Sequence, residues 1–146
     1  MNSKNYLKQV FFLNQRIDDS LQELEQLRVR AFSIGAIDTS KDKVQSGKIS
    51  DIVGDNASAI IDLEAKINRK INEYAQRKNE VECMIDRMVD DALKLILQKR
   101  YLLFKEWEQI AVDIGYTYRH TIRLHGEALR AFNKIYVLEC PIESVV

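Results

Sequence analysis

The chain has 146 residues, of which 46% are hydrophobic and 30% are charged, so it can bury a core as one domain or as two small ones. One proline and five glycines leave long uninterrupted stretches, which predicts an all-α fold. No run of apolar residues is long enough to span a membrane, no signal peptide is evident, and Cys83 and Cys140 are too few for a zinc site. We therefore expect a cytoplasmic protein with no metal, no cofactor and reduced thiols.

The first predicted helix spans residues 6–31. Its apolar residues recur every three or four positions along one side, as in an amphipathic helix. They are Val10, Leu13, Ile17, Leu21, Leu24, Leu27 and Ala31. Polar residues fill the other faces, so the helix has a single apolar seam that needs a partner.

Residues 33–55 lose this periodicity, because glycines stand at positions 35, 47 and 54 among serines, aspartates and lysines. The pattern predicts a long, mobile loop. Within it, the sequence DKVQSG at Asp42–Gly47 has two interpretations: a functional motif, or part of a loop that merely reverses the chain.

A second long helix is predicted over residues 56–88. Its apolar side is formed by Ile60, Leu63, Ile67, Ile71, Tyr74, Val81, Ile85 and Met88. Two long helices joined by a generous loop predict an antiparallel, coiled-coil-like hairpin over residues 1–88, in which Lys70, Arg77 and Lys78 oppose acidic residues of the first helix. Such a hairpin buries little by itself, so it packs either on the C-terminal helices or on a second copy of the chain, and we expect a homodimer through these helices.

The C-terminal third is predicted to hold three shorter helices. In residues 89–102, Leu93, Ile96 and Leu97 supply a supporting helix. A helix of about two turns follows from Trp107, and Gly115 ends it, since glycine adopts the left-handed conformation at little cost. Ala111 is small where two steeply crossing helices approach closely.

The last helix begins after Thr117, a predicted N-cap, and continues to about Leu138. Its inward stripe comprises Thr121, Leu124, Ala128, Leu129 and Phe132. Residues 117–134 contain four basic residues and one acidic residue, Glu127, whereas the whole chain has no net charge. An outward face of arginines suits phosphate contacts and base-edge hydrogen bonds in a major groove. The alternative is an ordinary amphipathic helix with a solvated basic face.

The pair of helices joined at Gly115 predicts a DNA-binding helix-turn-helix. The residues predicted to contact DNA are Thr117, Tyr118, Arg119, His120, Ile122, Arg123, Arg130 and Lys134. His120 lies near the start of the second helix, where it can reach phosphate or base, and His125 is expected to pack near the hinge of the domain. Catalysis has little support, because no metal-ligand set, phosphate loop or nucleophile turn is present, so we expect no enzyme.

The stretch Trp107–Phe132, WEQIAVDIGYTYRHTIRLHGEALRAF, resembles the region-4 helix-turn-helix of bacterial sigma factors, with its isoleucine-alanine pair, turn glycine and terminal alanine-leucine. More narrowly, the chain resembles small sigma-70 region-4-like regulators of phages and prophages, akin to RinA and ArpU. This narrower likeness is carried by YLKQVFFLNQRID at 6–18, DKVQSG at 42–47, LILQKRY at 95–101, WEQIAVDIGY at 107–116 and RLHGEAL at 123–129. One departure is Thr121, where such helices usually carry a branched aliphatic residue, so a buried hydroxyl there needs a carbonyl partner.

The residue patterns divide the chain into a helical hairpin over residues 1–88, a helix-turn-helix domain over 89–138 and a tail over 139–146, and the resemblance likewise implies an N-terminal helical segment coupled to a C-terminal module. It also implies a regulator of late phage or prophage genes that binds double-stranded DNA as a dimer or alongside RNA polymerase. Two alternatives stay open: a sigma-like interaction protein that contacts polymerase or another partner without its own DNA specificity, and a packaging adaptor of the small-terminase kind. In that adaptor family the DNA module usually comes first, whereas here it comes last.

Overall fold

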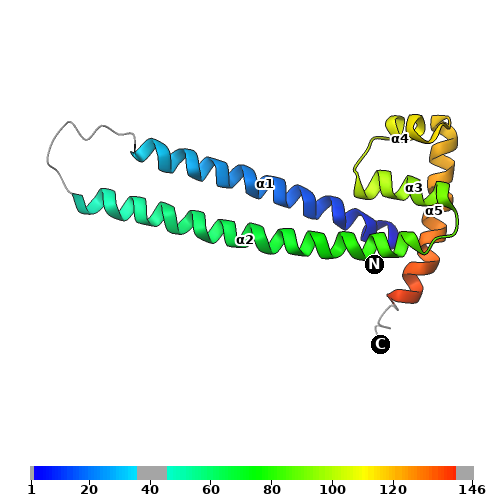
Figure 1. The fold of residues 1–146 in the computed structure, drawn as a ribbon, viewed down its shortest axis with the longest axis horizontal. Coiled ribbons are helices and arrows are strands. Elements are labelled where there is room, and N and C mark those ends of the chain that lie inside the picture. Colours follow the sequence, from blue (N-terminus) through cyan, green and yellow to red (C-terminus); the bar gives the residue numbers. More distant parts are fainter. Residues whose placement is uncertain (1, 36–45, 141–146) are drawn as a thin grey trace. The chain divides into compact units, whose positions relative to one another are not determined.

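The computed structural model describes residues 2–35 and 46–140, and within these ranges the chain is all-helical with no strand, which confirms the predicted class. The elements are α1 (Ser3–Gly35), α2 (Ser46–Asp86), α3 (Asp91–Leu97), the π-helical turn η1 (Gln98–Leu102), α4 (Trp107–Ile114) and α5 (Tyr118–Glu139) (Figure 1). None of the described helices is both long and apolar enough to cross a membrane.

The chain forms two compact units. One, which we call the seam unit, is Asn14–Glu73; the other, the core unit, combines Met1–Leu13 with Tyr74–Val146. The first turns of α1 and the last turns of α2 thus belong to the same unit as α3, η1, α4 and α5. The segments 1–88, 89–138 and 139–146 inferred from the sequence divide the chain at other points, and as functional domains they stay a prediction.

The two long helices extend further than their sequence patterns indicate. The predicted loop over residues 33–55 is wrong at both ends, because α1 continues to Gly35 and α2 already begins at Ser46. Glycine inside a helix costs about 1 kcal/mol relative to alanine, whereas only proline removes the hydrogen bond outright, so a long helix can run through Gly54. Residues 36–45 and the side chains of the Asp42–Gly47 motif lie outside the described residues.

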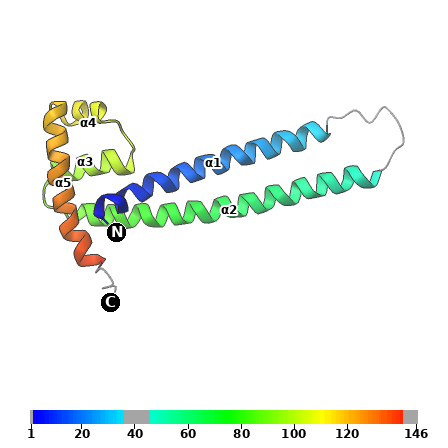
Figure 2. The ribbon, with the colours of Figure 1, turned by 180° about the vertical axis from the view of Figure 1, so that it is seen from behind.

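In the seam unit, α1 and α2 lie side by side and run in opposite directions, as both ribbon views agree (Figures 1 and 2). Its buried apolar residues are Ile17, Leu24, Leu63 and Ile67. Leu21 and Ile71, predicted to lie in the seam, are instead 46% and 41% exposed. Ser20 is buried in their place, and its hydroxyl accepts a 2.7 Å hydrogen bond from Lys70 and donates one to the carbonyl of Arg16.

The core unit buries a larger and more continuous set of side chains. Its buried cluster consists of Tyr6, Leu7, Val10, Val81, Met84, Ile85, Met88, Leu93, Leu97, Tyr101, Leu102, Ala128, Phe132 and Tyr136. The Tyr6 hydroxyl donates to Glu80, and Arg77 lies over the Tyr6 ring and binds Glu80 on its own helix. Arg77 therefore does not pair with an acidic residue of α1 as predicted; it pairs within α2, because the α1 group that faces it is a ring.

Candidate nucleic-acid interface

Helix α4 is a short support for α5. Its buried residues are Ile110 and Ala111, and the helix packs against α5 and α3. Ala111 is 5% exposed, so its small side chain lies inside the packed region, as predicted for a close helix crossing. A longer side chain at this position would have to displace its neighbours.

The turn between α4 and α5 depends on the backbone of Gly115. Its φ is 74°, in the left-handed region, and its N–H donates to the carbonyl of Val112. The N–H of Tyr116 donates to the carbonyl of Ala111 at 3.0 Å, which completes a Schellman-type C-cap. A Cβ added at Gly115 would meet nothing within 4 Å, so the requirement for glycine comes from the backbone angle and not from space.

Thr117 caps the start of α5, as the sequence predicts. Its hydroxyl oxygen accepts a 3.2 Å hydrogen bond from the N–H of His120. Its carbonyl accepts the hydroxyl of Thr121 at 2.9 Å. Thr121 is completely buried, and this bond supplies the carbonyl partner that its hydroxyl requires.

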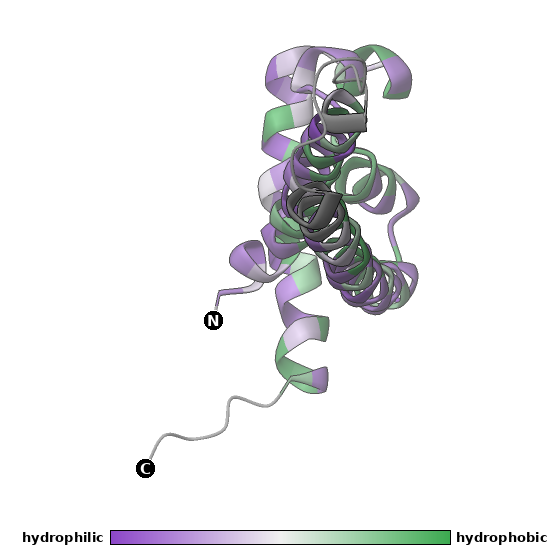
Figure 3. Ribbon diagram, turned by 90° about the vertical axis from the view of Figure 1, so that its left-hand side faces the viewer, coloured by the Kyte–Doolittle hydropathy of each residue, from purple (hydrophilic) through white to green (hydrophobic). Residues whose placement is uncertain are grey.

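The inward side of α5 matches the predicted stripe. Thr121, Ala128 and Phe132 are buried, and Leu124 and Leu129 are partly buried against the core. His125 is half-buried: its ring is 4.5 Å from that of Trp107, and its Nε2 is 2.9 Å from the hydroxyl of Tyr101. In Figure 3 hydrophilic and hydrophobic residues alternate along α5, the helix that leads to the C-terminal label.

The opposite side of α5 carries four cations, Arg119, Arg123, Arg130 and Lys134, all exposed. At 100° per residue they fall within an arc of about 60°, directly across the helix from the buried stripe, and they span about 22 Å along its axis. Among the described residues, none of the four has a carboxylate within the 4.0 Å of an ion pair. This side of α5, which we call the basic face, therefore presents uncompensated positive charge.

The other predicted contact residues lie beside the basic face. Thr117, Tyr118 and Ile122 are exposed, whereas His120 is half-buried. The His120 Nδ1 atom lies 3.1 Å from the Arg123 guanidinium, and its ring makes an edge contact with Tyr116.

The turn residue Tyr116 was missed by the sequence interpretation. It is 45% exposed and lies against His120 in the turn that leads into α5. An aromatic residue directly after the turn glycine was the signal that could have identified it.

Two nearby lysines do not add to the basic face. Lys99 and Lys105 donate to one carboxylate oxygen of Asp113, at 3.2 and 2.8 Å, and Gln109 donates to the other at 2.7 Å. These hydrogen bonds, led by that of Lys105, hold the pKa of Asp113 well below its usual range. The charge of Lys99 is thus compensated by Asp113, and this ion pair joins η1 to α4.

The described residues contain no group of three or more histidine, cysteine, aspartate or glutamate side chains arranged to hold a metal ion. Cys83 and Cys140 are both free thiols.

Comparison of the chain with protein-family models, with curated proteins and with solved structures finds no match.

Proposed function

We propose that this protein is a DNA-binding transcription regulator in which α4, the Gly115 turn and α5 act as a helix-turn-helix. The observation that carries the proposal is the basic face of α5: four exposed cations without ion-pair partners in a chain whose net charge is zero. A helix with such a face suits the major groove, which admits an α-helix and is bordered by phosphates.

The proposal assigns different roles to the two ends of α5. In helix-turn-helix proteins the first residues of the second helix reach the base edges. We therefore assign sequence reading to Tyr118, Arg119 and Arg123, and phosphate contacts to Arg130 and Lys134, which lie further along the helix. Thr117, His120 and Ile122 complete the proposed contact surface.

We propose that the rest of the chain positions this helix-turn-helix for DNA binding. In this view the long helices form an antiparallel hairpin that brings two chains together as a homodimer. Support comes from apolar residues of the seam unit that remain exposed, among them Leu21, Ile61 and Ile71. A dimer would hold two α5 helices at a fixed separation and favour a symmetric DNA site. The resemblance to sigma region-4-like regulators implies late genes of a phage or prophage as targets, with RNA polymerase as a further partner.

The test is binding of the full-length chain to a duplex library with a randomised segment, followed by fluorescence anisotropy on the selected sequence. The Arg119→Ala/Arg123→Ala double variant should bind at least tenfold more weakly and lose preference for the selected sequence. The Arg130→Ala/Lys134→Ala double variant should weaken binding to all duplexes, and the slope of log K against log salt should fall by about 1 per lost phosphate contact.

The matched control is Arg16→Ala/Arg69→Ala, which removes two exposed arginines of the seam unit. This variant should bind DNA like the parent, and circular dichroism should give the same helix content for all three doubles. Equal affinity of the parent and the Arg119→Ala/Arg123→Ala variant would remove these residues from the site. A parent that shows no salt-sensitive binding to any duplex would contradict the proposal and favour an interaction protein without DNA specificity.

Sedimentation of the full-length chain separates the proposed dimer from the packaging alternative. A dimer that dissociates in a Leu21→Glu/Ile71→Glu variant supports pairing through the seam unit, because charge at these exposed positions disrupts an apolar interface without emptying the core. A ring of many subunits would favour the packaging adaptor, and a strict monomer at high concentration would contradict the dimer.

A further inference from the structure

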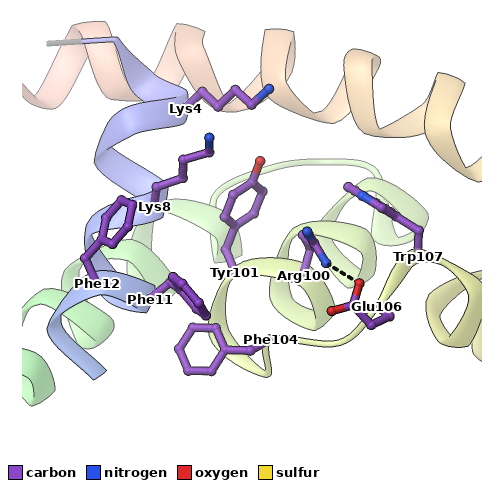
Figure 4. Close-up of a pocket in the computed structure, with 9 residues that line it drawn as sticks. All are labelled: Lys4, Lys8, Phe11, Phe12, Arg100, Tyr101, Phe104, Glu106 and Trp107. Atoms are coloured by element: carbon purple, nitrogen blue, oxygen red, sulfur yellow. Dashed lines mark hydrogen bonds and ion pairs between the residues drawn. The ribbon is translucent and has the colours of Figure 1, made fainter. Parts of the chain in front are cut away.

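A second candidate site lies in the core unit, away from the basic face of α5. It is a pocket of about 370 Å³ formed by the first turns of α1, by η1 and by the segment that leads into α4 (Figure 4). Three cations line it, Lys4, Lys8 and Arg100, together with a group of phenylalanine rings, Phe11, Phe12 and Phe104. Nothing in the proposed DNA contact uses these residues.

The charge of the pocket is positive and largely uncompensated. Among the described residues, no carboxylate lies within ion-pair distance of Lys4 or Lys8. The lining contains one acidic residue, Glu106, whose side chain is 79% exposed and lies 3.5 Å from Arg100. Three cations against one carboxylate leave an excess of two positive charges, which favours an anionic occupant.

Arg100 is held in a fixed orientation at the edge of the pocket. Its guanidinium lies 4.9 Å from the centre of the Trp107 ring and donates a 2.9 Å hydrogen bond to the carbonyl of Lys105. A guanidinium oriented in this way loses little freedom when it binds an oxyanion, and its planar group of donors matches a carboxylate or sulfonate.

Two of these cations also act on His125. Burial, followed by the positive charges of Lys4 and Arg100, lowers the pKa of His125 to about 4. The cations on the two sides of the pocket therefore act on a common region of the core unit.

The apolar wall of the pocket is unusually exposed. Phe11 and Phe12 are 40% and 57% exposed, whereas phenylalanine is a residue type that is often fully buried. Phe104 adopts a φ of 57°, the left-handed region that bulky residues rarely occupy, and its ring makes an edge contact with Phe11 at 5.5 Å. Backbone conformations of this kind persist where the surroundings require them, and they gather at binding sites.

We propose that this pocket binds a small aromatic anion, with its acidic group among Lys4, Lys8 and Arg100 and its ring against Phe11, Phe12 and Phe104. The volume lies in the lower part of the range of about 300 to 1,000 Å³ found for small-molecule sites, which favours a compact ligand over a helix or strand of a partner. The proposal does not rest on the DNA-binding function.

The probe is anilinonaphthalene sulfonate, which combines fused rings with one acidic group, and its matched control is phenylnaphthylamine, the same ring system without the sulfonate. The chain has one tryptophan, Trp107, which lines the pocket, so energy transfer from Trp107 reports dye bound in or near the core unit, and the variants below assign it to this pocket. Titration of the full-length chain should reach saturation at one dye per chain, and phenylnaphthylamine should bind at least tenfold more weakly.

Variants separate the pocket from other apolar patches. Lys4→Gln/Lys8→Gln and Phe12→Ala should each weaken dye binding at least tenfold. The charge control is Arg16→Gln/Lys66→Gln in the seam unit, where both side chains are exposed, and the apolar control is Phe32→Ala, whose ring is 85% exposed. Both controls should bind like the parent.

Four results would overturn the proposal. They are an absence of saturable energy transfer, equal affinity for phenylnaphthylamine, unchanged affinity of the Lys4→Gln/Lys8→Gln variant, and loss of binding in Phe32→Ala.

Discussion

The seam unit and the core unit are both built from helices with one apolar side, yet they bury that side to different depths. In the core unit Leu7, Val10, Ile85 and Phe132 are completely buried. In the seam unit the buried cluster consists of Leu24, Leu63 and Ile67, each still slightly exposed. A helix pair covers only one side of each partner, whereas a third and fourth helix close the remaining sides.

This difference explains why a polar pair is tolerated in the seam unit. Ser20 and Lys70 are hydrogen-bonded across the two helices, each three residues after a buried isoleucine, Ile17 or Ile67. Lys70 is only partly buried, so its charge keeps access to water and its desolvation cost stays small. Among the described residues of the core unit, no buried side chain is a lysine or an arginine.

The largest expected effect comes from truncation of a core-unit side chain. Phe132→Ala should lower the free energy of unfolding by about 3 to 5 kcal/mol, because a completely buried ring leaves a cavity. Leu24→Ala in the seam unit should cost about 2 kcal/mol, at the lower limit for such changes. Urea denaturation followed by Trp107 fluorescence reports the core unit, and circular dichroism reports both units.

The comparison fails if Leu24→Ala shifts the Trp107 transition as far as Phe132→Ala does. That result would mean that the two units unfold together as a single cooperative structure.

The turn between α4 and α5 could be predicted from the sequence because its causes are local. Gly115, Thr117 and Thr121 act through backbone angles and hydrogen bonds to residues within a few positions, and the structure confirms each of them. The inward stripe of α5 was equally predictable, since one helix period decides which residues share a side.

A second prediction uses two glycines of the core unit. Gly115→Val should destabilise the core unit by about 1 to 3 kcal/mol, because valine strongly disfavours a φ of 74°. Gly126 lies inside α5, and a Cβ there meets nothing within 4 Å. Gly126→Ala should therefore stabilise the chain by about 0.5 to 1 kcal/mol. Thermal melts should show a lower melting temperature for Gly115→Val and a higher one for Gly126→Ala than for the parent. A Gly115→Val variant as stable as the parent would show that the turn does not need the left-handed angle.

Features that depend on distant neighbours escaped prediction. Leu21 and Ile71 fit the helix period but lie exposed, because the facing helix covers only part of each apolar stripe. The role of Asp113 as acceptor for Lys99 and Lys105 depends on how η1 and α4 pack. The left-handed Phe104 carried no local signal either, since the residues that favour this conformation are glycine and asparagine.

A third, smaller effect is a pH dependence confined to the core unit. In the unfolded chain His125 has its ordinary pKa of 6.5, and in the folded chain burial and the charges of Lys4 and Arg100 lower that pKa to about 4. Between these values the unfolded state binds more protons, so the free energy of unfolding should fall as the pH drops from 6.5 towards 4. The pKa of Asp113 is also lowered in the folded chain, but the stability that this carboxylate contributes is lost only at a pH below the ordinary range of carboxyl pKa values.

The measurement is urea denaturation of the parent and of His125→Gln across this pH window. Glutamine keeps a hydrogen-bonding group near the Tyr101 hydroxyl but does not titrate. In the variant, the free energy of unfolding should depend much less on pH between 6.5 and 4. If it depends on pH as strongly as in the parent, a group other than His125 causes the dependence.

The smallest expected effect comes from the ion pair of Arg28 and Glu64, which joins α1 and α2 in the seam unit at 2.8 Å. Both side chains are about half exposed, 53% and 43%, so water screens the pair and each long side chain loses freedom in forming it. Arg28→Ala should therefore change the free energy of unfolding by less than about 1 kcal/mol, and 1 M salt should remove most of that difference. Denaturation at low and high salt, followed by circular dichroism, measures it. A loss as large as that of Leu24→Ala would mean that charge, and not the shallow apolar seam, holds these two helices together.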